Sequence, residues 1–296
     1  KDRIKMFVQM IMAKSLKERK KILEKLQKLQ KSDFIEILKA MEGYKVTIRL
    51  LDPPLHEFLP TSKDKKILAR AKELEEVNPM MGHRGVRLGI TSPEIYEIQI
   101  KAVFEATAEL VKKKINAKPQ IMIPQVSSIA ELNHIKSIYD NVKSNMEKKY
   151  KIKFKINFGT MLEVVRACLT SDELSNTAEF FSFGTNDLTQ GVYSFSREDV
   201  EGKFLGKYMD EGIVEISPFQ SIDESGVGNL MKIGIERGRN KQKDLEIGIC
   251  GEHGGDPNSI KFCHSVNVTY VSASPYRIPT AILAGAQAVI EQKTKN

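Results

Sequence analysis

The order of strand-like and helix-like segments predicts an α/β fold, with a (β/α)₈ TIM barrel as the best match. Seven short apolar runs alternate with longer helical patterns, which implies right-handed crossovers and a parallel sheet. The chain has 296 residues, close to the roughly 250 residues typical of such a barrel. Chemically active side chains follow several strands, where barrel active sites form. An open doubly wound sheet, which places ligands at a switch point, is the structural alternative.

The N-terminal region is predicted to contain two helices and then the first recognisable strand. Residues 4–41 have a helical pattern that we expect to break near Ser32 and Asp33, whose side chains could cap a second helix. Gly43 suits the end of that helix. The apolar run at residues 46–51 is then a strand, because the two prolines that follow cannot continue it.

The rest of the chain alternates between the two element types. A long polar region at residues 185–225 interrupts the alternation, and Ser225 is expected to cap the helix that follows. Further strands are predicted at residues 85–90, 121–126, 154–162, 180–183, 245–250 and 268–272. Further helices are predicted at residues 65–77, 94–114, 129–150, 227–239, 258–266 and 278–291, with a turn and a short helix at 163–174. We predict one domain spanning residues 1–296.

The composition excludes several classes of protein. The hydrophobic fraction is 41% and the charged fraction 28%, as in soluble globular proteins, and no apolar run approaches the roughly 20 residues that span a bilayer. We therefore expect no membrane partner. The net charge is +8, but Leu and Ile interleave with the Lys residues, which predicts the solvated faces of amphipathic helices. Because no nucleic-acid motif accompanies this charge, we expect no nucleic-acid partner. An anionic small substrate is compatible with it.

The cysteines and the start of the chain bear on location. Cys168, Cys250 and Cys263 are odd in number and form no CxxC motif, so a disulfide framework is not expected and a reducing compartment is predicted. The chain begins without Met and without a secretory leader, so it is expected to be a fragment of a longer protein. We predict a cytoplasmic location, with an organelle as the alternative because the N-terminus is missing.

Two acidic residues and a cysteine lie at the ends of predicted strands. Glu163 and Asp187 each follow a buried strand, and Cys250 ends another. Mg²⁺ is a hard ion that takes oxygen ligands, usually with one or two protein carboxylates among them. A nearby thiol could transfer a proton. The pattern suggests a magnesium site beside a proton-transfer group; helix-capping or salt-bridged carboxylates and a buried core cysteine are the alternatives.

Four motifs stand out along the chain. They are IRLLDPPLHEFLP at residues 48–60, NPMMGHRG at 78–85, FFSFGTNDLTQ at 180–190 and GICGEHGGDP at 248–257. In this order they resemble the phosphoenolpyruvate-binding domain of the pyruvate, phosphate dikinases. The FGTNDLTQ block within the third motif is shared with phosphoenolpyruvate synthase and with enzyme I of the sugar phosphotransferase system. The first and fourth motifs look more like the dikinase than either relative.

The resemblance implies a Mg²⁺-dependent site on a (β/α)₈ barrel, in a homodimeric enzyme. There, pyruvate and a phosphohistidine carried by another domain interconvert with phosphoenolpyruvate. The complete family enzyme converts ATP, pyruvate and phosphate into AMP, phosphoenolpyruvate and diphosphate. The family's barrel begins with a strand that precedes the start of this chain, so the fragment is expected to lack its first strand. The phosphohistidine domain is likewise expected outside these residues.

The resemblance also implies roles for individual residues. Glu163 and Asp187 match the Mg²⁺ ligands, which also contact the substrate, and Cys250 matches the general acid/base at the methylene carbon. Arg49 matches a substrate-binding arginine, and Arg84 is expected to play a related part, because guanidinium groups bind phosphate and carboxylate in bidentate fashion. Either arginine could instead pair with an acid of the barrel.

The glycine-containing turn after the strand at residues 180–183 matches further substrate contacts. Gly184 would let the backbone approach the ligand, and Thr185 and Asn186 would donate to its oxygens. His253 lies near the predicted acid/base and is interpreted as a turn residue that orients the loop. A phosphoenolpyruvate synthase, enzyme I and a non-catalytic dimerisation or docking module are the alternative functions.

Overall fold

The computed structural model describes residues 2–53, 59 and 65–295, so part of the motif at residues 48–60 lies outside the described residues. Contacts divide the chain into two compact units, which are described separately below. Unit 1 comprises Lys1–Gln125 and Ala130–Phe158, and unit 2 comprises Val126–Ile129 and Gly159–Asn296. The single domain expected from the sequence stays a prediction.

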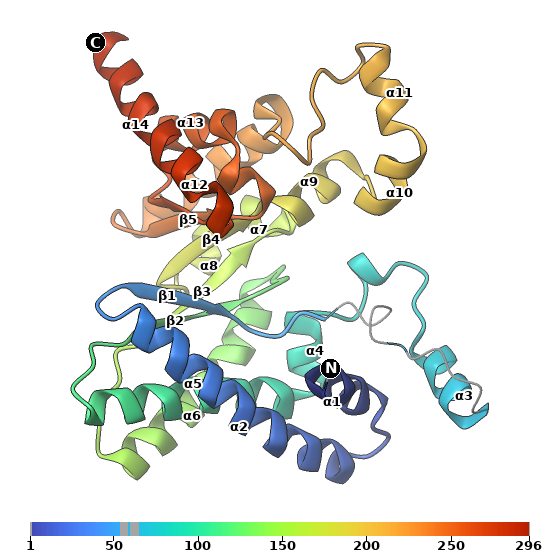
Figure 1. Cartoon of the computed structure of the whole chain (residues 1–296), viewed down its shortest axis with the longest axis vertical. Helices are drawn as coiled ribbons and strands as arrows, with labels where there is room; N and C mark the ends of the chain where they lie inside the picture. The colour runs from blue at the N-terminus through green and yellow to red at the C-terminus, as the bar shows by residue number, and fades with distance from the viewer. Residues whose placement is uncertain (1, 54–58, 60–64, 296) are drawn as a thin grey trace. The chain divides into compact units, whose positions relative to one another are not determined.

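The strands form the parallel α/β sheet that the sequence predicts (Figure 1). They are β1 (Lys45–Arg49), β2 (Lys118–Ile123), β3 (Asn157–Leu162), β4 (Phe180–Gly184), β5 (Glu246–Cys250) and β6 (Tyr270–Val271). The strand order in the sheet follows the chain, and the pairs β1–β2, β3–β4, β4–β5 and β5–β6 are parallel. A sheet in chain order has no switch point, so the doubly wound alternative is wrong. The expected partial barrel is confirmed.

Helices fill the segments between the strands. Those up to β3 are α1 (Asp2–Met12), α2 (Leu16–Ala40), α3 (Lys65–Leu74), α4 (Val86–Thr91), α5 (Pro93–Lys112) and α6 (Ile129–Tyr150). Those after β3 are α7 (Val165–Leu169), α8 (Ser171–Leu174), α9 (Thr185–Tyr193), α10 (Arg197–Lys203), α11 (Leu205–Asp210), α12 (Asn229–Lys241), α13 (Pro257–Ser265) and α14 (Ile278–Lys295). None of the helices described combines the length and the apolar character needed to cross a bilayer.

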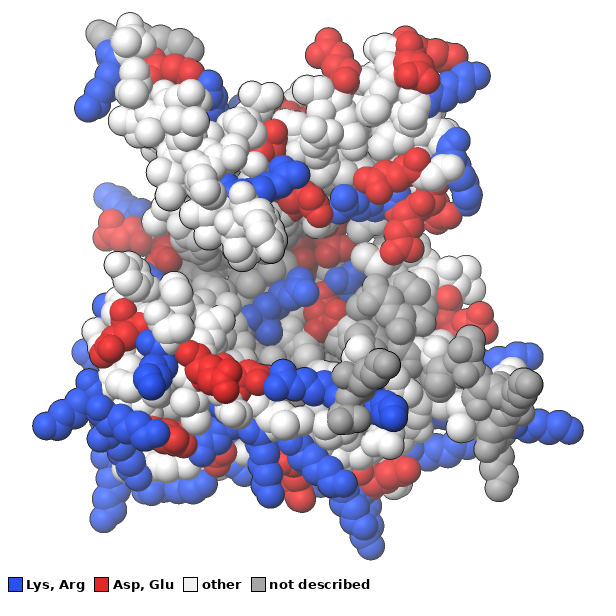
Figure 2. Space-filling view, in the orientation of Figure 1, with Lys and Arg blue, Asp and Glu red and all other residues white. Residues whose placement is uncertain are grey.

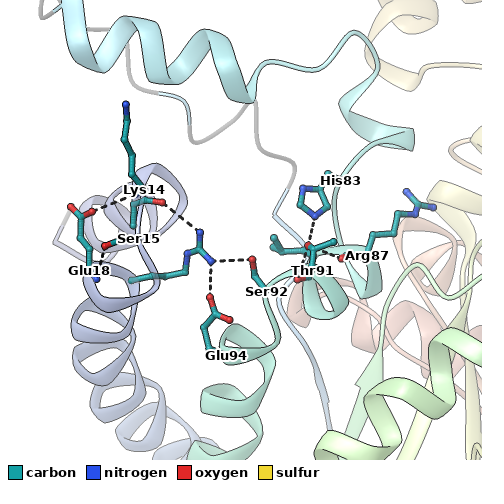
Figure 3. Close-up of polar contacts among 11 residues, drawn as sticks. Lys14, Ser15, Glu18, His83, Arg87, Thr91, Ser92 and Glu94 are labelled. Atoms are coloured by element: carbon teal, nitrogen blue, oxygen red, sulfur yellow. Dashed lines mark hydrogen bonds and ion pairs between the residues drawn. The ribbon is translucent and has the colours of Figure 1, made fainter.

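The break between the first two helices comes earlier than predicted. Ser15 caps α2, because its Oγ accepts the backbone N–H of Glu18 at 3.2 Å (Figure 3). The helix then continues through Ser32 and Asp33 without interruption. The carboxylate of Asp33 pairs with Arg3 of α1 at 2.7 Å, so it joins two helices instead of capping one.

Helix α2 packs against α5, and the two helices lie side by side in Figure 1. Arg19 of α2 donates to Glu94 at 2.6 Å and to Ser92 at 3.1 Å, both at the start of α5 (Figure 3). The opposite face of α2 carries exposed lysines, as the amphipathic pattern predicts. Figure 2 shows Lys and Arg side chains projecting from unit 1 in the region where Figure 1 places α2.

The segment at residues 85–90, predicted as a strand, is the helix α4. Its alternation of Val86, Leu88 and Ile90 is typical of a strand, but in α4 Val86 and Leu88 lie on different sides of the helix and both are buried. The chain enters α4 through Gly85 at φ +57°, and the N–H of Val86 donates to the carbonyl of Pro124 at 3.1 Å. Six strands, not seven, are therefore found among the described residues.

The polar region at residues 185–225 is more helical than predicted, because α9, α10 and α11 lie within it. Its last part leads into a single π-helical turn, Glu224–Gly228. Asp223, not Ser225, caps that turn: its carboxylate accepts the N–H groups of Ser225, Gly226 and Val227. A carboxylate at a helix start is also favoured by the helix dipole.

Candidate active site

The ends of β3, β4 and β5 lie together at one edge of the sheet. Phe183 of β4 is opposite Leu162 of β3, and Gly184 is opposite Cys250 of β5. Because the strands are parallel, Glu163, the residue after Leu162, lies at the same edge as the cysteine. Unit 2 thus brings the predicted metal-binding and proton-transfer residues to one place in the fold.

Glu163 is nearly buried, with 3% of its surface exposed, and its carboxylate lies against the backbone of Gly184. A Cβ atom at Gly184 would lie 2.5 Å from Glu163 Oε2 and 2.7 Å from Met161 Sδ. Both distances are under 3.0 Å, so a side chain at position 184 would require Glu163 and Met161 to shift. The group close to this backbone is thus the Glu163 carboxylate, and the approach of a ligand to Gly184 stays a prediction.

Asp187 is fixed by a glutamine that the sequence analysis did not single out. Asp187 lies in the first turn of α9, and Gln190 Nε2 donates to its Oδ1 at 3.2 Å. The Oε1 atom of Gln190 accepts the backbone N–H of Arg197 at 2.9 Å. Gln190 thereby joins the start of α10 to the carboxylate of Asp187. Its position at the end of the FFSFGTNDLTQ motif was the available signal.

Asn186 presents an acceptor atom that the described protein groups do not satisfy. Its Oδ1 is buried and has no hydrogen-bond partner within the described structure. The amide faces the turn after β5, since a Cβ at Gly251 would lie 3.4 Å from this oxygen. Buried polar atoms without partners are rare, and one at a strand edge is suited to a ligand.

The three thiols differ in their surroundings. Cys250 is partly exposed, and its Sγ lies 3.5 Å from the carbonyl oxygen of Phe183. Cys168 and Cys263 are buried, and burial raises the pKa of each thiol to about 12. Only the thiolate is a strong nucleophile, so these two cysteines are packing residues.

We expect iodoacetamide to alkylate Cys250 at pH 8 well before the other two cysteines. The pKa of about 12 for Cys168 and Cys263 leaves almost no thiolate at that pH, and both are shielded from reagent. Peptide mass spectrometry over a time course measures this directly. Modification of all three cysteines at equal rates in folded protein would contradict the assignment, and urea-unfolded protein is the control in which all three should react.

Unit 1 holds the predicted substrate arginines. Arg49 is the last residue of β1 and is exposed. The backbone around it is held by α5, because Gln99 accepts the N–H of Leu51 at 2.8 Å and donates to the carbonyl of Arg49 at 3.4 Å. The hydroxyl of Tyr96 donates to the carbonyl of Leu51 at 3.0 Å. The sequence analysis did not single out either of these two α5 side chains.

Arg84 is buried and forms a bidentate ion pair with Asp52. Its Nε donates to Asp52 Oδ1 at 2.8 Å and its Nη2 to Oδ2 at 2.6 Å, with 5% of Arg84 exposed. Nη1 approaches the carbonyl of Met80 at 3.4 Å. The structure contains the ion pair with an acid that the sequence left open as an alternative for Arg84. Substrate contact by this arginine stays a prediction.

A cavity of about 380 Å³ in unit 2 lies beside the turn that follows β5. Arg197, Glu252 and Arg277 contribute charged groups to its lining. Arg197 pairs with Glu201 at 3.1 Å and with Glu252 at 3.7 Å, and its guanidinium lies over the ring of Phe219. The carboxylates of Glu201 and Glu252 thus balance the positive charge of Arg197.

Comparison with known proteins identifies the family. A family model described as "PEP-utilising enzyme, PEP-binding domain" matches residues 5–289. The chain belongs to the PEP-utilising enzymes. Members of this family with similar sequences include a protein named pyruvate, phosphate dikinase from Entamoeba histolytica, 49% identical over all of this chain and 36% of that protein. A rice protein named pyruvate, phosphate dikinase 1, chloroplastic, is 47% identical over 98% of this chain and 32% of its own length.

The chain therefore spans about a third of the length of the curated relatives it matches. Among solved structures, a citrate lyase from Burkholderia xenovorans aligns with 68% of this chain and 60% of its own, at 11% identity and a TM-score of 0.43. The family membership and the parallel sheet agree with the resemblance found in the four motifs.

The residues of this PEP-binding domain fit a magnesium ion. The available donors are carboxylate oxygens from Glu163 and Asp187 and the buried, unpartnered Oδ1 of Asn186. Among residues 2–53, 59 and 65–295, no group of three or more His, Cys, Asp and Glu is placed to hold a metal. A Mg²⁺ site does not need such a group, because the ion keeps several waters and uses only one or two carboxylates.

Proposed function

We propose that this chain is the catalytic part of a pyruvate, phosphate dikinase that interconverts phosphoenolpyruvate and pyruvate with a phosphohistidine on another domain. The overall reaction is ATP + pyruvate + phosphate = AMP + phosphoenolpyruvate + diphosphate. The observation that supports it is the arrangement at one sheet edge: Glu163 lies over Gly184, and Gly184 is directly opposite Cys250. Membership of the PEP-utilising family supports phosphoenolpyruvate and pyruvate as the substrates of this arrangement.

In this proposal Glu163 and Asp187 hold Mg²⁺, and Asn186 and the backbone at Gly184 and Thr185 bind substrate oxygens. A bound Mg²⁺ supplies electrostatic stabilisation of negative charge on an oxygen of the substrate. The burial of Glu163 strengthens such an interaction, because water competes poorly there.

Cys250 carries out the proton transfer. In the direction of pyruvate, its thiol gives a proton to the methylene carbon C3 after the phosphoryl group has left, and the sulfur becomes a thiolate. In the reverse direction the thiolate takes a proton from the methyl group, the electron pair of that C–H bond forms the C2–C3 double bond, and the π pair of the C2 carbonyl moves onto its oxygen. Partial exposure at a strand end gives the sulfur access to substrate.

The two arginines would bind the anionic groups of the substrate. Arg49 is exposed at the end of β1, and its guanidinium suits a carboxylate or phosphate. Arg84 would act from within its pair with Asp52, as a fixed positive group. The single domain, the homodimer, the separate phosphohistidine domain and a cytoplasmic or organellar location are further proposals, which rest on the family resemblance.

We expect wild-type protein to exchange the methyl protons of pyruvate with deuterated solvent only when Mg²⁺ is present. Glu163→Gln should raise the Mg²⁺ concentration needed for half-maximal exchange, by more than the roughly 10- to 100-fold loss of metal affinity that follows from changing a residue beside a metal ligand. Proton NMR of the methyl signal, followed against Mg²⁺ concentration, measures both. Glu173→Gln is the matched control, since Glu173 is an exposed acid of α8 away from this edge.

The outcomes separate the alternative functions. Exchange that proceeds equally well in EDTA would refute the metal assignment. No exchange by folded protein would favour the non-catalytic docking module. A phosphoenolpyruvate synthase would also exchange the methyl protons, but the complete enzyme would then turn over without added phosphate.

A further inference from the structure

His253 is buried in the turn after β5 and connects three segments of unit 2. It is fully shielded from solvent. Its Nδ1 lies 2.7 Å from the hydroxyl of Thr185, at the start of α9, and its Nε2 lies 2.9 Å from the carbonyl oxygen of Pro218. The Thr185 hydroxyl is also 3.1 Å from the carbonyl oxygen of Cys250. A simple turn residue does not need these contacts.

A count of protons fixes the direction of these hydrogen bonds. A carbonyl oxygen can only accept, so the Nε2 atom of His253 carries a hydrogen and donates it to Pro218. In the neutral ring Nδ1 is then an acceptor, and the hydroxyl of Thr185 must donate to it. Thr185 has one hydroxyl proton, so it cannot also donate to Cys250. The shorter of its two distances, 2.7 Å, is the one to His253.

The surroundings favour this neutral form. Burial lowers the pKa of His253, and the nearby cation Arg197 acts in the same direction. The hydrogen bond to Pro218 and the charges of Asp256 and Glu252 oppose this without reversing it. At neutral pH the ring therefore accepts from Thr185.

The network ends at the backbone of Cys250, the residue that the proposed function uses. Thr185 Oγ1 packs against the turn after Cys250, because a Cβ at Gly251 would lie 3.1 Å from it. Gly251 has φ +107°, a backbone conformation that favours glycine. The Cys250 Sγ itself lies against Phe183, two residues before Thr185. Movement of Thr185 would therefore move the end of β4 and the turn after β5, the two segments beside the thiol.

We propose that His253 is a positioning residue for proton transfer: by holding the hydroxyl of Thr185 it fixes the ends of β4 and β5 and so the place of the Cys250 sulfur. This inference rests on the proposed function, which assigns the proton transfer to Cys250. His253 does not touch the substrate in this role. It acts through Thr185 and the Gly251 turn.

The test compares His253→Gln, Thr185→Val and the double variant in the full-length protein. In His253→Gln the amide can still reach Pro218 but leaves the hydroxyl of Thr185 without its acceptor, and Thr185→Val removes the hydroxyl while keeping the shape. For pyruvate methyl exchange, each should lower kcat about 10- to 100-fold and leave KM for pyruvate nearly unchanged. The double variant should be no worse than the poorer single variant, because both remove one interaction.

A conservative variant and a second measurement distinguish a positioning role of His253 from a defect in folding. His253→Asn keeps an acceptor near the position of Nδ1, so it should retain more of kcat than His253→Gln. The rate at which iodoacetamide alkylates Cys250 should change in His253→Gln and Thr185→Val, and this rate does not depend on turnover. Ser221→Ala is the control, because Ser221 ties the same loops together through Asp256 without touching Thr185. It should leave kcat and the alkylation rate unchanged.

Two results would overturn the inference. One is a wild-type kcat together with a wild-type alkylation rate in Thr185→Val. Because this variant leaves His253 unchanged, the result is informative even if the His253 variants do not fold. The other is an equal fall in Ser221→Ala, which would indicate general loosening of the loops. By contrast, a wild-type protein that does not exchange pyruvate protons would refute the proposed function, while the alkylation rates would still show whether His253 positions the thiol.

Discussion

Cys250→Ala should lower the rate of pyruvate methyl exchange by about 10²- to 10⁴-fold, the usual contribution of a positioned acid or base. The alanine fills the same place at the end of β5 but has no group that can take up or release a proton. Binding of pyruvate and Mg²⁺ should remain, because the carboxylates and Asn186 are untouched. Exchange measured by NMR, with Mg²⁺ binding measured by calorimetry in the same sample, gives both numbers.

Cys168→Ala is the matched control for that experiment. Cys168 is a buried thiol of α7, so Cys168→Ala makes the same chemical change at a position in the core. It should cost some stability and leave the exchange rate near that of the wild type. Full exchange in Cys250→Ala would show that another group moves the proton.

Asp52→Ala should lower the free energy of unfolding by about 3–5 kcal/mol, the effect of breaking a buried ion pair. The side chain of Asp52 is fully shielded and that of Arg84 is 6% exposed, so removal of the carboxylate takes two charged hydrogen bonds from a buried guanidinium. Urea denaturation followed by circular dichroism measures the change.

The control for this prediction is Asp33→Ala, which breaks another Asp–Arg pair. The side chains of Arg3 and Asp33 are 57% and 39% exposed, so water already screens their interaction. The loss should be about 1 kcal/mol or less. Similar losses for Asp33→Ala and Asp52→Ala would contradict the distinction. Replacing both Asp52 and Arg84 with apolar residues should cost less than Asp52→Ala alone.

The sequence predicted the long, regular elements well. Helix α6 has the predicted bounds, because its apolar residues recur over six turns with helical spacing. The prediction failed where few residues carried the pattern. The run from Val86 to Ile90 is too short for its pattern to decide between a strand and a helix, and the N–H of Val86 bonds to Pro124, a contact that no local pattern shows. Asp33 looked like a cap because its partner, Arg3, is 30 residues away.

The same reason separates the parts of the site that could be predicted from those that could not. Glu163, Asp187 and Cys250 follow strands, and parallel strands end at one edge, so sequence alone could place them together. Their supports depend on long-range contacts. His253 meets Thr185 across 68 residues, and Gln99 meets Arg49 across 50. No local pattern marks such a side chain as anything but a turn or core residue.

The missing side chain at position 184 has a consequence for protein engineering. The volume that a methyl group would fill there is taken by the carboxylate of Glu163, so the two positions share one space. A redesign that seeks a different ion preference by shortening or replacing the acid would open a void over the glycine, and any larger residue at 184 would expel the acid. The two positions are therefore best mutated jointly.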